Sequence, residues 1–166
     1  MKIKTLGVLL VMFAAPVSAQ PGPPPAPGPV SLPMSVALEA AEAAQGACTA
    51  KNSATAVQVF DANGFLKVAL VADGTRTGLI EFARRKAYTV IKKKVSSREF
   101  GKPLGNKMDA GAPAIEGDAN LIAYAGGLPV LKNGQLVGAL AVSGPGGQDQ
   151  DEDCAMAGLA KIKDRL

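Results

Sequence analysis

An Asn133-Gly134 pair between two apolar runs is the feature that most restricts how this chain can fold. The pair readily adopts the positive φ angles of a two-residue type I′ turn, so the stretch from Gly127 to Val142 predicts a tight β-hairpin. A glycine-rich loop follows, and after it Asp149 and Glu152 have the spacing of a capping box, which predicts a capped helix near the end of the chain. We expect any binding site to lie near this junction of hairpin, loop and helix.

The first 19 residues have the pattern of a secretory signal peptide. Lys2 and Lys4 precede an apolar run from Leu6 to Ala15, and the small residues up to Ala19 suit a signal peptidase. A membrane anchor is the alternative, but the run is shorter than the ~20 residues that span a bilayer as a helix. We therefore expect cleavage after Ala19, an exported protein that is periplasmic or secreted, and no membrane span in the mature chain.

Residues 20–33 are rich in proline, which favours extended polyproline conformations and offers little to bury. This composition predicts a stiff linker, with a ligand for a proline-reading domain as the alternative. Residues 34–166 then form a single domain, long enough and apolar enough to build a core.

The charge of the chain is nearly balanced. Without Lys2 and Lys4 the mature chain has 16 basic and 14 acidic residues, a net charge of +2. Nucleic-acid binding usually needs a basic surface or basic residues interleaved with aromatic ones, and neither is present. We expect no nucleic-acid partner.

Two cysteines, Cys48 and Cys154, are the whole cysteine content of the chain. In an oxidising compartment a single pair predicts one disulfide, whereas two buried thiols or a redox pair are the alternatives.

Helix and strand signals succeed one another along the chain. Two segments of helical period and two short β-branched or apolar runs precede the hairpin, at residues 34–50 and 77–95 for the helices and at 55–60 and 65–72 for the strands. In the first helix the buried face is predicted to hold Met34, Leu38, Ala41, Gln45 and Cys48.

The stretch 101–118 shows no sustained period and is a candidate lid over a pocket. Residues 121–124 are interpreted as a strand or irregular structure. Hairpins dominate the order of elements, so we predict an α/β (α+β) domain in which helices cover an antiparallel sheet. The first and last helices must be adjacent if the disulfide forms.

Several of these segments together resemble the GlcG/HbpS-like haem-binding family over residues 32–166. The matching pieces are Phe60-Asp61-Ala62-Asn63-Gly64, Asp73-Gly74, Ala83-Arg84-Arg85-Lys86-Ala87-Tyr88-Thr89, Gly127-Leu128-Pro129-Val130 through Gly138, Val142-Ser143-Gly144, Gln148-Asp149 and Ala157-Gly158. The resemblance implies a profilin-like fold, assembly into homo-oligomers from dimers to octamers, and binding of haem or a related tetrapyrrole. It also implies roles in haem uptake, storage or redox sensing. Haem-degrading activity is a further expectation that rests on the resemblance alone.

The chain contains no histidine, so the usual proximal imidazole of a haem site is absent. A protein-derived axial ligand must then be tyrosine, methionine, cysteine or lysine. The candidates are Tyr88, Tyr124, Met108 and Met156, and the two cysteines are excluded if they form a disulfide.

Arg84 and Arg85, with Lys86, are candidates to neutralise haem propionates, because guanidinium groups match carboxylates well. The alternative is a solvated helix face or an oligomer contact. The second candidate region is the glycine-rich loop, where Ser143, Gly144, Gly146 and Gly147 precede a helix and could shape one wall of a pocket or face an anion. A plain strand-to-helix turn is the alternative.

A cluster of acids at 149–153 is interpreted as stabilising a helix start rather than binding iron. No catalytic set emerges, since a Ser-His-Asp arrangement requires histidine. The sequence therefore predicts an exported haem- or tetrapyrrole-binding protein. The alternative is a non-enzymatic oligomeric scaffold or small-acid-binding protein of the same fold without haem.

Overall fold

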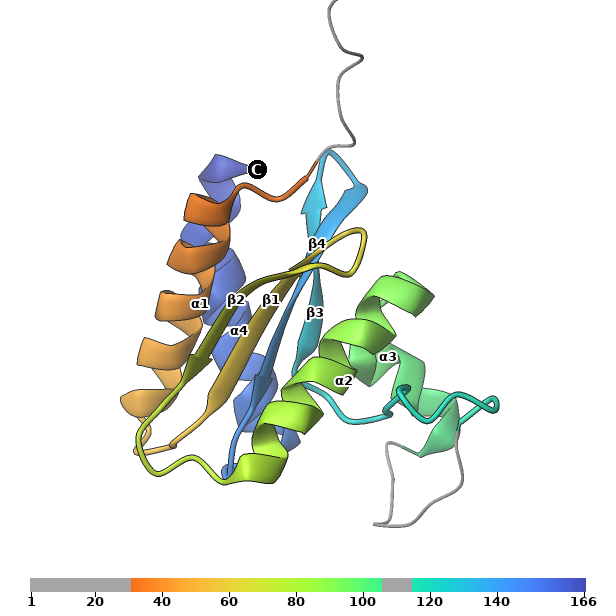
Figure 1. The fold of residues 1–166 in the computed structure, drawn as a ribbon, viewed down its shortest axis with the longest axis horizontal. Helices are drawn as coiled ribbons and strands as arrows, with labels where there is room; N and C mark the ends of the chain where they lie inside the picture. The colour runs from red at the N-terminus through yellow and green to blue at the C-terminus, as the bar shows by residue number, and fades with distance from the viewer. Residues whose placement is uncertain (1–30, 106–114) are drawn as a thin grey trace, which may run out of the picture.

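The computed structural model describes residues 31–105 and 115–166. Four main helices, of which α3 is short, and four strands succeed one another (Figure 1) as α1 (Met34–Thr49), β1 (Ala56–Asp61), β2 (Leu66–Val71), α2 (Thr77–Lys93), α3 (Ser97–Gly101), β3 (Gly127–Lys132), β4 (Gln135–Ser143) and α4 (Gln148–Ile162). Short 3₁₀ turns follow α3 and α4, at Lys102–Leu104 and Lys163–Arg165. The predicted signal peptide and most of the linker lie outside the described residues.

The strands form one antiparallel sheet in the order β2-β1-β4-β3. The Asn133-Gly134 hairpin is confirmed: Lys132 pairs with Gln135, and Asn133 and Gly134 have φ angles of 50° and 79°. The predicted α/β (α+β) class with an antiparallel sheet is therefore confirmed. Residues 121–124 form no strand.

Helices cover both faces of the sheet. The helices α1 and α4 lie side by side on one face, and α2 crosses the other (Figure 1). Along β1, Val57 and Val59 face the core under α1 and α4, whereas Ala56 and Phe60 belong to the smaller clusters under α2. A central strand covered on both faces is mostly apolar, as β1 is at Ala56, Val57, Val59 and Phe60.

The contact between α1 and α4 depends on small residues. Ala40 and Ala44 of α1 are fully buried, and a Cβ placed on Gly158 of α4 would lie 2.6 Å from the Ala40 carbonyl oxygen. The predicted face of the first helix was partly wrong, because Met34 and Leu38 are 54 % and 38 % exposed. Alanines leave a shorter gap between helices than long side chains, so the alanine stripe is the face that packs.

The first and last helices are joined covalently. Cys48 and Cys154 form a disulfide with a sequence separation of 106 residues, and both cysteines are fully buried. The predicted disulfide and the predicted adjacency of the two helices are confirmed. Within the part of the chain that the structure describes, no helix has the length and apolar character needed to cross a membrane.

Candidate functional site

A cavity of about 310 Å³ lies between α2 on one side and the C-terminal end of β1 and the turn that follows it on the other. Phe60 and the turn residues Asn63 and Gly64 form one side. The other side is a single stripe of α2, because residues four apart along a helix share a face. Its members are Arg84, Tyr88, Ile91 and Lys92.

Arg84 is held at the edge of this cavity by two partners. Its Nε and Nη2 atoms donate to both carboxylate oxygens of Glu81 at 2.8 and 2.7 Å, and Nη2 also donates to the Asn120 side-chain oxygen at 2.7 Å. The Glu81 hydrogen bonds raise the pKa of Arg84 above its ordinary value. Arg84 therefore presents a permanent positive charge beside an apolar wall.

Tyr88 donates its hydroxyl hydrogen to Asp118 Oδ2 at 2.8 Å, and Lys92 Nζ lies 6.0 Å from the Tyr88 ring centroid. The hydrogen bond to Asp118 is the largest cause that raises the pKa of Tyr88. The pKa of Asp118 is lowered, first by the Asn120 backbone N–H and then by the Tyr88 hydroxyl. Tyr88 is thus a phenol held by a carboxylate.

A second cavity of about 330 Å³ lies beside the first and shares Lys92 with it. Its other lining residues are Lys93, Glu116, Asp118 and Leu121. Asp118 lines this second cavity and Tyr88 lines the first, so their hydrogen bond lies between the two spaces.

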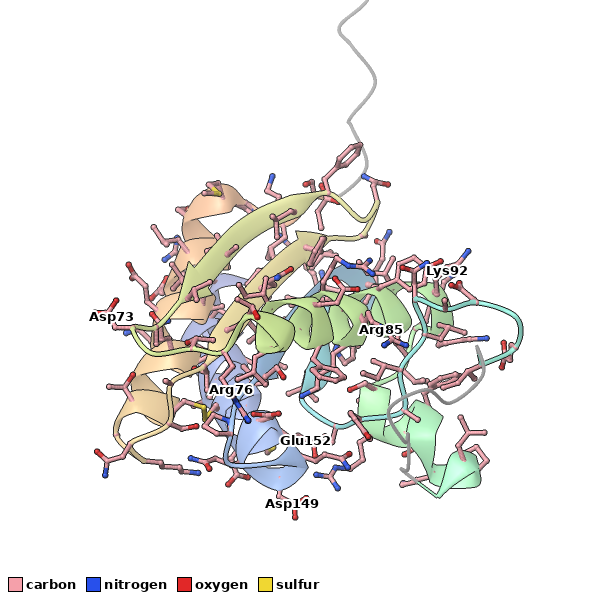
Figure 2. All side chains as sticks on the ribbon, turned by 60° about the horizontal axis from the view of Figure 1, so that its bottom comes forward. Asp73, Arg76, Arg85, Lys92, Asp149 and Glu152 are labelled. Atoms are coloured by element: carbon pink, nitrogen blue, oxygen red, sulfur yellow. A yellow bond between two sulfur atoms is a disulfide. The ribbon has the colours of Figure 1, made fainter. Side chains whose placement is uncertain are left out.

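Residues 115–122, which we call the strap, run along α2 and are tied to it by side chains. Besides Tyr88 with Asp118 and Arg84 with Asn120, the Arg85 Nη2 atom donates to the Leu121 carbonyl at 2.8 Å. Thr89 Oγ1 accepts from the Ile122 amide at 2.9 Å, and Lys93 pairs with Glu116. Figure 2 shows Arg85 and Lys92 on the side of α2 that carries the strap.

The three predicted propionate partners, Arg84, Arg85 and Lys86, therefore diverge, and the prediction was wrong for Lys86, which is buried and lines neither cavity. Arg84 lines the first cavity, whereas Arg85 bonds the backbone of the strap and is absent from the lining of both cavities. Lys92, which was not predicted as a site residue, takes the second cationic position of the first cavity. Its spacing of four from Tyr88 and eight from Arg84 is the signal that would have found it.

The glycine-rich loop lies at another place in the fold. Ser143 is buried and pairs with Ala56 at the end of β4, and a Cβ on Gly144 would lie 2.4 Å from Thr55 Cγ2. Gly147, with φ 87°, precedes α4 as its N-cap residue. None of Ser143, Gly144, Gly146 and Gly147 lines either cavity beside α2.

The predicted capping box at the start of α4 did not form, because the helix begins at Gln148 and no side chain caps it. Asp149 and Glu152 instead both pair with Arg98 after α2. Figure 2 shows the two acids at the first turn of α4. Ion pairs with Arg98, a residue of α3, therefore take the place of the side-chain cap that the spacing predicted.

A buried ion pair between Lys86 and Asp151 was not anticipated from the sequence. Lys86 Nζ lies 2.6 Å from Asp151 Oδ2 and donates to the Val142 carbonyl at 2.8 Å, with the two side chains only 2 % and 5 % exposed. Burial lowers the pKa of Lys86 and raises that of Asp151, and the attraction between the charges opposes both shifts. The sequence did hold one signal for a buried lysine, because Lys86 lies on the same helix face as the apolar residues Ala83 and Val90.

The other predicted iron ligands among the described residues do not line the first cavity. Met156 is 57 % exposed on α4, and the Tyr124 ring packs 6.0 Å from the Phe82 ring. Met108 lies outside the described residues, and the disulfide removes both cysteines as ligands. Among residues 31–105 and 115–166, no three His, Cys, Asp or Glu residues are grouped so as to hold a metal ion.

The family model described as Haem degrading protein HbpS-like matches residues 32–160. The chain belongs to the HbpS-like family. A solved double mutant of Streptomyces reticuli HbpS is 32 % identical, with a TM-score of 0.72 over 89 % of this chain and 97 % of that one. A structure of a PduOC:heme complex is 26 % identical, with a TM-score of 0.68 over 80 % and 96 % of the two chains.

A third solved structure shares the fold at lower identity. Klebsiella pneumoniae protein ORFY is 21 % identical, with a TM-score of 0.69 over 84 % of this chain and 96 % of that one. A search of curated proteins gave no match. The family and the fold that the resemblance implied are confirmed. The structure also shows why several of the matching segments lie together: Lys86, the start of β3 at Gly127 and the first turn of α4 meet at the buried ion pair.

Proposed function

We propose that this protein is exported and binds haem or a related tetrapyrrole in the cavity beside α2. The observation that carries the proposal is the stripe of α2, where Tyr88 lies between two cationic residues, Arg84 and Lys92, and lines the same cavity as the apolar side chains of Phe60 and Ile91. Family membership and the haem complex of the PduOC relative support the same ligand class.

The donor set of this cavity fits a haem. A tetrapyrrole is a broad apolar ring with carboxylate side chains, so it requires apolar walls with cations at the rim. Tyrosine is an established axial ligand of haem iron. Tyr88 is the residue that would bind the iron, Arg84 and Lys92 would hold the carboxylates, and Phe60 and Ile91 would exclude water from the ring. A bound haem would supply an iron centre at this site.

Arg84 is prepared for this role before any ligand arrives. Glu81 fixes the guanidinium from one side with two hydrogen bonds, and a guanidinium has five N–H donors in a rigid fork. Donors remain to meet a carboxylate, so little side-chain entropy is lost on binding. The flexible ammonium group of Lys92 complements it at the other end of the stripe.

Titration of haem into the purified mature protein tests the proposal. We expect a saturable shift of the haem absorption band, weaker binding and an altered band for Tyr88→Phe, and unchanged binding for Tyr124→Phe, which also removes one hydroxyl. The absence of any saturable shift would contradict haem binding. A stable oligomer that is indifferent to haem would instead favour the scaffold alternative.

Export and self-assembly are parts of the proposal with tests of their own. Mass spectrometry of the exported protein should give a chain that starts at Gln20, because Ala19 ends the predicted signal. Sedimentation of the mature protein should give a homo-oligomer between a dimer and an octamer, as the family resemblance implies. A monomer at all concentrations would contradict the second expectation.

A further inference from the structure

Tyr88 and Asp118 form the boundary between the two cavities beside α2. Tyr88 lines the first, Asp118 lines the second, and Lys92 lines both, with its ammonium nitrogen 6.0 Å from the Tyr88 ring. The 2.8 Å hydrogen bond between the two side chains therefore crosses the space that a ligand extending along α2 would fill.

The same strap also holds the second polar group of the site. Asn120, two residues after Asp118, accepts a hydrogen bond from Arg84 Nη2 at 2.7 Å. Asp118 Oδ1 accepts from the Asn120 backbone and side-chain N–H groups at 2.8 and 3.1 Å, which fixes the two strap residues relative to each other. In this conformation the groups proposed to meet iron and carboxylate are both engaged by the strap.

We propose that the Tyr88–Asp118 contact is an autoinhibitory latch, which must open for the two cavities to join into one groove for the tetrapyrrole. This inference rests on the proposed function and concerns the regulation of the same site. Each cavity alone is near the lower end of the range for small-molecule sites, roughly 300–1,000 Å³. A ligand as large as a tetrapyrrole needs the joined space, and iron needs the Tyr88 oxygen that the latch orients toward the strap.

The latch lowers the apparent affinity, because the competent conformation is only a fraction of the population. The contact is partly exposed, so opening it requires little free energy and the change in affinity is modest. The rest of the strap stays attached to α2 by Thr89 and Arg85, which bond the backbone of Ile122 and Leu121. Opening is therefore a local movement around Asp118 that leaves the segment docked.

The test compares Asp118→Ala with Asp118→Asn, both as full mature protein. Alanine removes the acceptor of the Tyr88 hydrogen bond, whereas asparagine removes the charge and keeps an acceptor oxygen. We expect Asp118→Ala to bind haem about two- to fivefold more tightly and faster than the wild type. Asp118→Asn should remain closer to the wild type. Circular dichroism of each variant verifies folding.

A second measurement needs no ligand. Hydrogen exchange at the Asn120 amide, which Asp118 protects, should accelerate in Asp118→Ala while the Ile122 amide, held by Thr89, stays protected. Loss of protection at both amides would mean that the whole strap detaches, which would overturn the local latch.

The remaining outcomes separate this inference from the proposed function. If the wild type binds haem and Asp118→Ala binds it equally or more weakly, the latch is wrong and the binding proposal stands. Equal tightening in both Asp118 variants would assign the effect to charge and also overturn the latch. If no variant binds haem, both the proposed function and this regulation of it fail.

Discussion

Lys86 Nζ and Asp151 Oδ2 lie 2.6 Å apart in the interior and connect α2 to the first turn of α4 past the start of β3. Lys86 reaches α4 because β3 begins with glycine: a Cβ on Gly126 would lie 3.0 Å from Lys86 Nζ, and a Cβ on Gly127 would lie 2.8 Å from the Lys86 carbonyl oxygen. The ion pair therefore links the helices on opposite faces of the sheet.

Removing one member of this pair should destabilise the fold strongly. Lys86→Met leaves the Asp151 carboxylate buried without its cation, so we expect a loss of about 3–5 kcal/mol in the free energy of unfolding, measured with urea. Lys51→Met is the matched control, because it breaks the exposed ion pair between Lys51, in the turn after α1, and Asp153 of α4, and it should cost at most about 1 kcal/mol. Equal losses in the two variants would contradict this explanation.

The alternation of elements was predictable because local signals determine it. The Asn133-Gly134 turn, the helical period of residues 77–95 and the short strands each depend on nearby residues, and all agree with the structure. The single disulfide followed from two cysteines in a chain predicted to be exported.

Contacts between distant segments were less predictable. Lys86 looked like part of a basic cluster, but Asp151, 65 residues later, makes it an interior residue. Asp118 belongs to an aperiodic stretch, so its contact with Tyr88 had no local signal. The stripe of Arg84, Tyr88 and Lys92 was visible in the sequence, yet only the turn after β1 shows that it faces a cavity.

Gly158 should be sensitive to the smallest possible addition. A Cβ at this position would lie 2.6 Å from the Ala40 carbonyl oxygen and 2.7 Å from a Leu140 methyl group, so Gly158→Ala must push α1 and α4 apart. We expect a loss of about 1–3 kcal/mol in the free energy of unfolding. Gly46→Ala is the control: it lies in α1 with no atom near the new methyl group and should gain about 0.5–1 kcal/mol from helix propensity. A neutral Gly158→Ala would show that the helix contact is looser than described.

Loss of the disulfide should lower stability without changing the order of elements. Cys48→Ala together with Cys154→Ala opens a connection spanning 106 residues, and we expect a loss of about 2–5 kcal/mol in the free energy of unfolding. The remaining α1–α4 contact is alanine-rich and should keep the helices paired, with unchanged circular dichroism. Titration of the folded wild type with a thiol reagent should find no reactive thiol, since both cysteines are bonded and buried. Two reactive thiols would contradict the bridge.

The ionisation of Tyr88 should report its contact with Asp118. The hydrogen bond raises the pKa of Tyr88 above 10.0, so the folded protein keeps the phenol proton longer than the unfolded chain does. The stabilisation from this bond is fully present below pH 10 and is lost as the pH rises through the pKa of the folded state. In a Tyr124→Phe background Tyr88 is the sole tyrosine, and absorbance at the tyrosinate band then follows it alone. Asp118→Ala should move the midpoint toward 10.0, because both the acceptor of the hydrogen bond and the repelling carboxylate are gone. An unchanged midpoint would mean that the two side chains do not interact in solution.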